Sequence, residues 1–118
     1  MKKLSPSPAS LNKAMKRLEN ALAALAAAGE TTAYGQLAKD LGLRMADLTA
    51  QLEVLMEEDA ARNRPFRAAL LRQRLSPDNL PAPGFFFKAA ALGHPTNDPA
   101  AFTKAQREAN FLSPNIPG

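Results

Sequence analysis

The scarcity of β-branched residues is the feature that most constrains the fold of this 118-residue chain. The chain contains one valine, one isoleucine and five threonines, whereas alanine occurs 24 times and leucine 17 times. Alanine and leucine favour helices, while a sheet needs β-branched and aromatic side chains to cover its pleated face. The composition therefore predicts a mainly α fold with at most a short β-hairpin.

The length and the distribution of prolines predict a single domain with two tails. A chain of this length buries one modest core, which we place within residues 10–111. Residues 1–9 read as a flexible basic tail, and residues 112–118 read as an extended tail. The chain has no cysteine, and no apolar run approaches the roughly 18 residues of a membrane-spanning helix. We therefore expect a cytoplasmic protein that has no contact with a membrane.

The first predicted helix covers residues 11–28, with Ser10 as its N-cap and Gly29 as its terminator. Its large apolar residues recur at intervals of three and four, which places them in one stripe along the helix. Such a stripe faces the core or forms the seam of a homodimer. The stripe consists of Leu11, Met15, Leu18, Leu22 and Leu25.

Two further helices are predicted on either side of Gly42, one starting after Thr32 and one covering residues 45–59. A tight glycine-containing turn between two short helices is typical of a helix-turn-helix. Residues 66–74, bounded by Pro65, are the best candidate for a strand. Residues 85–92 form a short helix or a second strand, and a last helix follows Asp98 from residue 99 to residue 110.

Residues 31–56 resemble the helix-turn-helix of bacterial winged-helix transcription factors, in which a threonine, a Leu-Ala pair and a Leu-Gly turn recur at this spacing. Residues 64–71 and 80–86 also resemble a module of uncharacterised bacterial and phage winged-helix-like proteins. The string Thr31–Ala38 is similar to the DNA-binding half of alkyltransferase-type repair proteins, but their reactive cysteine is missing here. The resemblance implies a winged-helix-like domain with three N-terminal helices, a short β-hairpin and one or two C-terminal helices.

The leading hypothesis is DNA binding, as a homodimer with a regulatory, nucleoid or phage-related role. The third helix would enter the major groove, where side chains in its first turns would contact base edges and one phosphate. These side chains are Arg44, Asp47, Thr49 and Gln51. A run of arginines with no acidic residue among them would contact the DNA backbone. The run consists of Arg62, Arg64, Arg67, Arg72 and Arg74.

The charge of the third helix favours an alternative function. Between residues 45 and 61 the chain has five acidic residues and no basic one, and DNA phosphates repel such a surface. The alternative is a protein-binding adaptor or inhibitor that uses the acidic helix and a phenylalanine-rich segment. The residues concerned are Glu53, Glu57, Glu58, Asp59, Phe85, Phe86 and Phe87. RNA binding has less support, because the chain lacks a ribonucleoprotein-type aromatic motif.

The sequence contains no pattern that predicts an enzyme. His94 is the single histidine, and without cysteine it has no companion ligands for a transition-metal site. The adjacent carboxylates of residues 57–59 are typical of a solvated helix end and lack the opposed geometry of an acid-base pair. We expect no catalytic residues, no metal and no cofactor.

Overall fold

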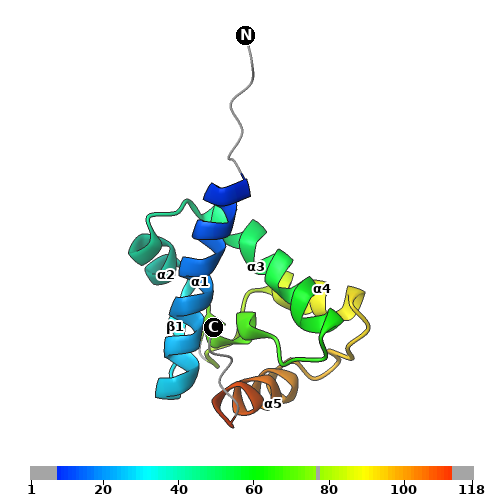
Figure 1. Cartoon of the computed structure of the whole chain (residues 1–118). Helices are drawn as coiled ribbons and strands as arrows, with labels where there is room; N and C mark the ends of the chain where they lie inside the picture. Colours follow the sequence, from blue (N-terminus) through cyan, green and yellow to red (C-terminus); the bar gives the residue numbers. More distant parts are fainter. Residues whose placement is uncertain (1–7, 77, 113–118) are drawn as a thin grey trace.

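The computed structural model describes residues 8–76 and 78–112, and within them it shows a mainly helical fold, as predicted (Figure 1). In the described part of the chain, no helix combines the length and the apolar character that crossing a bilayer requires. The elements are α1 (Pro8–Ala28), β1 (Thr32–Ala33), α2 (Tyr34–Leu41), α3 (Met45–Ala61), the 3-10 helix η1 (Arg67–Leu70), β2 (Leu71–Arg72), α4 (Pro83–Ala91) and α5 (Pro99–Leu112).

Helix α1 begins at Pro8, before the predicted Ser10 cap, and ends where the sequence predicts, because Gly29 adopts a left-handed backbone with φ of +68°. Leu18 and Leu22 are fully buried in the core of the same chain. They are therefore unavailable for the homodimer seam that the spacing also allowed. The side chain of Leu11 and the predicted tail residues 1–7 and 113–118 lie outside the described part.

Helices α2 and α3 are joined by the tight turn that the sequence predicts. Gly42 adopts φ of +67°, and the N–H of Leu43 donates to the carbonyl of Ala38 at 2.8 Å. Leu37 and Ala38 of α2 are buried in one core cluster with Leu48 of α3. The turn thus fixes the start of α3 beside α2.

The predicted hairpin is wrong, because the strand expected over residues 66–74 is reduced to Leu71–Arg72. For residues 85–92 the structure confirms the short helix, one of the two predicted alternatives. In place of a hairpin, the chain forms η1 and then β2, which pairs in parallel with β1 so that Thr32 lies opposite Leu71, and α4 contains all three consecutive phenylalanines. Residues 67–71 are all buried, without the alternation of a strand at a surface. Side chains of α5 bind the backbone of Phe66, the residue just before η1. Gln106 accepts from its N–H at 2.7 Å, and Asn110 donates to its carbonyl at 3.0 Å.

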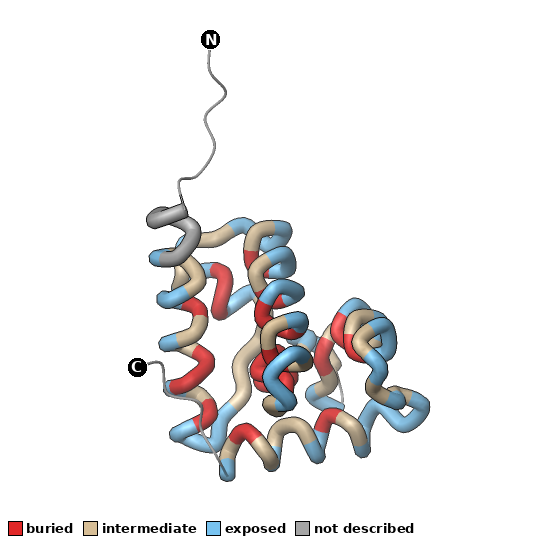
Figure 2. Tube along the Cα trace, turned by 45° about the vertical axis from the view of Figure 1, so that its right-hand side comes forward, coloured by how far each residue is buried: buried red, intermediate tan, exposed pale blue. Residues whose placement is uncertain are grey.

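The core includes Phe66, which is fully buried and packs against side chains of α4 and α5. The rings of Phe85, His94 and Phe102 lie 4.8 to 6.3 Å from the Phe66 ring, mostly edge to face. Figure 2 shows the buried positions gathered on the inward sides of the helices, with α5 running across one end of the molecule. This packing leaves one side of α2 and α3 facing solvent.

Candidate functional site

Most of the negative charge of α3 is neutralised within the chain. Asp47 binds Arg44 with an Nε–Oδ2 distance of 3.0 Å, Glu57 binds Lys88, and Glu58 binds Arg64 at 3.2 Å. Asp59 binds Arg67 in the interior of the protein. Glu53 is the one acidic side chain of α3 with no ion pair among the described residues. The surface of α3 is therefore less repulsive to phosphates than its sequence indicates.

Asp59 and Arg67 form a buried ion pair that joins α3 to η1. Asp59 accepts hydrogen bonds from the Nε and the backbone N–H of Arg67, each at 3.0 Å. Arg67 also binds Glu19 of α1 at 3.0 Å. Because Arg67 is only 3% exposed and Asp59 is fully buried, neither contacts DNA or a partner protein, and both predicted roles are wrong. Their role is structural. Burying a charged side chain away from water is unfavourable unless an opposite charge binds it, and here each residue compensates the other.

The Arg67 guanidinium stays charged in this interior position. Burial disfavours its charge, but the hydrogen bonds and negative charges of Asp59 and Glu19 outweigh burial and raise the pKa of Arg67. The sequence gives no sign of this pairing, because the two residues belong to different elements whose relative position depends on the turn between them.

The side chains predicted to read DNA lie in the first turns of α3 and are accessible, except for Gln51. Arg44 and Thr49 are exposed, and Asp47 is half-exposed. The hydrogen bond and charge of Asp47 raise the pKa of Arg44. Gln51 is half-buried, and its Oε1 is buried and accepts no hydrogen bond from the described residues. Gln51 is therefore poorly placed to reach a base.

The arginines that cluster in the sequence separate in the structure. Arg62 is exposed at the C-terminal end of α3, a 17-residue helix. At a rise of 1.5 Å per residue, Arg62 lies about 25 Å from the first turn of α3. Arg64 is half-buried and binds Glu58 and Asp59. Only Arg72 and Arg74, at the end of β2, remain together at the surface.

Arg72 and Arg74 line a polar hollow with Gly35 and Gln36, in the first turn of α2. The first backbone N–H groups of a helix have no partner within the helix, and the cap residue Ala33 offers no side chain to bind them. Neither arginine binds a carboxylate in the described part of the chain. Burial lowers the pKa of nearby Arg107, and the positive charge of Arg72 acts in the same direction, opposed by Tyr34. The arrangement is suited to an anion.

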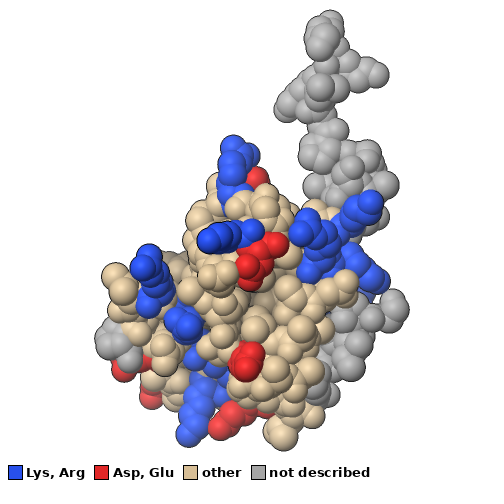
Figure 3. Space-filling model, turned by 90° about the vertical axis from the view of Figure 1, so that its left-hand side faces the viewer, with Lys and Arg blue, Asp and Glu red and all other residues tan. Residues whose placement is uncertain are grey.

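Figure 3 shows the side of the molecule that carries α2. Basic side chains occur at several places on this side, and acidic side chains lie between them. The face is thus not uniformly positive, and any attraction for a polyanion depends on local groups such as the polar hollow.

The three consecutive phenylalanines have three different environments. Phe85 is buried in the core, and Phe86 is half-buried with its ring 5.1 Å from that of Phe85. Phe87 is 77% exposed. An apolar hollow beside Phe87 is lined by Leu80, Pro83, Phe86 and Pro99, among others. Of the three phenylalanines, Phe87 is accessible to a partner, as the adaptor hypothesis requires, Phe86 is partly accessible, and Phe85 is not.

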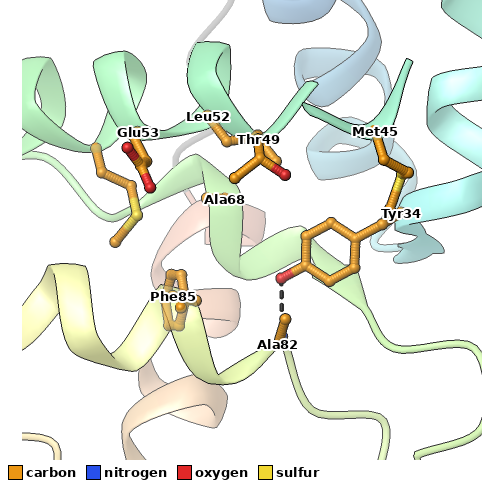
Figure 4. A pocket seen from close by; sticks show the side chains of 10 residues that line it. Tyr34, Met45, Thr49, Leu52, Glu53, Ala68, Ala82 and Phe85 are labelled. Atoms are coloured by element: carbon orange, nitrogen blue, oxygen red, sulfur yellow. Dashed lines mark hydrogen bonds between the residues drawn. The ribbon is translucent and has the colours of Figure 1, made fainter. Parts of the chain in front are cut away.

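A second apolar pocket, of about 130 Å³, lies between α3 and α4 (Figure 4). Leu52, Met56 and Phe85 form its apolar lining, and Glu53 lies at its edge. The Tyr34 hydroxyl accepts a hydrogen bond from the N–H of Ala82 at 2.9 Å, and burial raises the pKa of this phenol. Sequence reasoning missed this pocket.

The sequence contains one indication of the pocket, which is a second row of mostly apolar residues along α3. Met45, Thr49, Leu52 and Met56 recur at intervals of four, three and four, beside the core stripe of Leu48 and Leu55. Two adjacent stripes indicate a helix that packs on two sides, here against the core and against the start of α4.

No protein-family model, curated protein or solved structure matches this chain. Within residues 8–76 and 78–112, no three His, Cys, Asp or Glu side chains are placed to hold a metal ion. The functional argument therefore rests on the arrangement of the residues themselves.

Proposed function

We propose that this chain is a DNA-binding helix-turn-helix protein. The first turns of α3 enter the major groove, and the polar hollow beside α2 binds the phosphates that flank it. Residues 67–74 take the place of a wing next to the two helices, although they form η1 and β2 and no hairpin. The groups that bind DNA are Arg44, Thr49, Arg72, Arg74 and the first backbone N–H groups of α2.

The observation that carries this proposal is the pair of arginines beside the start of α2. Arg72 and Arg74 line one hollow with Gly35 and Gln36, and no carboxylate of the described chain binds them. Guanidinium groups and helix N-termini are both common phosphate contacts in protein–DNA complexes. Because such contacts fix the orientation of the protein on the duplex, they would set the approach of α3.

The ion pairs of α3 support the proposal by removing the main objection to it. Asp47, Glu57 and Glu58 each bind a cation of this chain, so most of the helix charge is compensated. Ala46 and Ala50 are exposed beside Thr49 and keep this part of the helix narrow. A narrow helix surface approaches base edges closely in a groove about 12 Å wide.

The experiment is a fluorescence-anisotropy titration of a labelled mixed-sequence duplex at several salt concentrations. We expect affinity to fall steeply with salt, and the double variant Arg72→Ala/Arg74→Ala to reduce the slope of log K against log salt by about 2. Arg62→Ala removes the same charge per residue at the far end of α3 and should leave the slope unchanged. Folded protein that shows no salt-dependent binding at low salt would overturn the proposal.

A second candidate is a protein-binding adaptor, which the exposure of Phe87 favours. An aromatic ring that is 77% exposed beside an apolar hollow is typical of an interface anchor. Glu53 is the exposed acidic residue of α3 that remains for a basic partner, because Glu57, which is also exposed, binds Lys88. If this candidate is correct, Phe87→Ala abolishes capture of the partner while Arg72→Ala/Arg74→Ala does not, and neither variant alters the salt slope with DNA.

A further inference from the structure

The apolar pocket between α3 and α4 has a lining that suits a small hydrophobic group. Leu52, Met56, Ala68 and Phe85 are buried residues that contribute to its wall. Figure 4 shows Met45, Thr49 and Glu53 extending from α3 on one side, with Phe85 and Tyr34 opposite them. Burying an apolar ligand against such a wall is favourable in proportion to the area removed from water.

The volume of the pocket limits the size of its ligand. The pocket measures about 130 Å³ and is partly open to solvent, and an enclosed apolar cavity of about 150 Å³ holds benzene. The space therefore accepts one ring or a branched aliphatic group, together with a short polar substituent that extends past the rim.

The polar groups around the pocket favour a cation as that substituent. Glu53 lines the pocket and forms no ion pair within the described residues, and the nearest comparable acid along the helix, Glu57, binds Lys88. The hydroxyls of Thr49 and Tyr34 add neutral polar groups to the lining. Among the described residues, no cationic side chain lines the pocket, so Glu53 would repel an anionic ligand.

We propose that this pocket binds a small hydrophobic ammonium ion. The apolar group lies against Leu52, Met56 and Phe85, and the ammonium group binds the Glu53 carboxylate. This site differs from the polar hollow of Arg72 and Arg74, and its occupancy is measured without DNA. If the protein failed to bind DNA, the proposal for this pocket would be unaffected. If the pocket failed to bind the ammonium ion, the DNA-binding proposal would be unaffected.

The test uses benzylammonium as the probe and benzyl alcohol as a neutral control of nearly the same shape. Each is titrated into ¹⁵N-labelled protein, and amide chemical shifts are recorded. We expect millimolar binding of benzylammonium, as suits a ligand of about eight non-hydrogen atoms, with shifts confined to α3 and the start of α4. Benzyl alcohol should bind about three- to fivefold more weakly, because the ion pair with Glu53 is partly exposed. Glu53→Gln should abolish the difference between the two ligands.

A second variant tests the location of the site independently of charge. Thr49 is exposed and lines the pocket, so Thr49→Phe places a ring within it and should eliminate binding of both ligands. Ala50→Phe adds the same ring at the next exposed position, outside the pocket, and should leave binding intact.

Several results would overturn the proposal. One is the absence of shifts in folded protein at saturating probe, and another is equal affinity for benzylammonium and benzyl alcohol. A third is a set of shifts centred on Phe86 and Phe87, which would assign the probe to the neighbouring hollow. Shifts on α3 that depend on protein concentration alone would show that a second copy of the chain occupies the pocket.

Discussion

Arg67 and Arg72 come from one arginine-rich segment but have opposite surroundings. Arg67 is buried and binds Asp59 and Glu19, whereas Arg72 is half-exposed and binds no carboxylate of the described chain. The same residue type therefore stabilises the fold at one position and remains available to a ligand at the other. The difference lies in the partner that the rest of the chain supplies.

The contrast extends to the regions around these two arginines. Near Arg67, side chains of α3 and α5 bind the backbone of residues 66–71. Near Arg72, the first turn of α2 has no side-chain cap. A region whose polar groups are bound internally should respond to mutation with a loss of stability. A region whose polar groups are unbound should respond with a loss of binding.

The largest expected effect comes from Arg67→Ala. This change leaves the Asp59 carboxylate buried without its main partner and should cost about 3–5 kcal/mol of unfolding free energy. Arg72→Ala should change that free energy by less than about 0.5 kcal/mol. Urea denaturation followed by circular dichroism measures both, and a loss for Arg67→Ala as small as that for Arg72→Ala would break the comparison. Arg67→Met combined with Asp59→Leu should recover part of the loss.

A smaller loss is expected for Arg107→Ala. The Arg107 guanidinium donates to the carbonyls of Ala69 and Asn79 at 2.7 Å and to that of Leu71 at 3.3 Å. Its removal should cost about 2 kcal/mol, the range for hydrogen bonds to a charged group, and should speed amide exchange in residues 66–80. Lys104→Ala, on the same helix and exposed, is the control and should leave exchange unchanged.

Tyr34 provides a pH-dependent test within the first turn of α2, because its buried hydroxyl is bound internally although the backbone N–H groups of this turn have no side-chain cap. Burial raises its pKa above the ordinary value of 10.0, so the phenol stabilises the fold below pH 10, and this contribution is lost as pH rises through the folded pKa. Because the chain has one tyrosine, ultraviolet absorbance reports this titration alone. We expect a midpoint above 10.0 in folded protein that falls to the ordinary value in urea. Tyr34→Phe should cost about 1 kcal/mol through the lost bond to Ala82.

The smallest expected effect on stability is that of Asp47→Asn. Its ion pair with Arg44 is exposed and screened by solvent, so the change should leave the urea midpoint almost unchanged. The same change frees Arg44 and removes a negative charge from the start of α3, and it should strengthen DNA binding at low salt. Glu108→Gln, exposed on α5, is the matched control and should leave DNA affinity unaltered. Weaker binding by Asp47→Asn would instead indicate that this carboxylate contacts a base.

The helices could be predicted because their signals are local. The apolar spacing of Leu18 and Leu22 predicts the buried side of α1, and Gly29 and Gly42 end helices at the predicted positions. The hairpin could not be excluded from local signals. Residues 66–71 are held by Gln106, Arg107 and Asn110 of α5, some 35 to 45 positions later in the chain.

The candidate site was predicted less completely than the fold. Arg44, Thr49 and Arg74 are exposed and Arg72 is half-exposed, so these side chains are accessible, and their contact with DNA stays a prediction. For Arg67 and Asp59 the prediction failed, because a charged residue type does not reveal whether its partner lies in solvent or in the chain. Met45, Thr49, Leu52 and Met56 of α3 line the pocket and recur at helical spacing in the sequence. Periodicity shows that such residues share one side of a helix, but it does not show whether neighbouring elements fill the space beside them.

Helix α5 makes its polar contacts much as a bound peptide does. Its side chains pair with the N–H of Phe66 and with the carbonyls of Phe66, Ala69, Leu71 and Asn79. The loop formed by residues 92–98 is then a tether that keeps this peptide at high effective concentration. Cutting the tether would turn a folding step into a bimolecular association between a four-helix fragment and a separate helix.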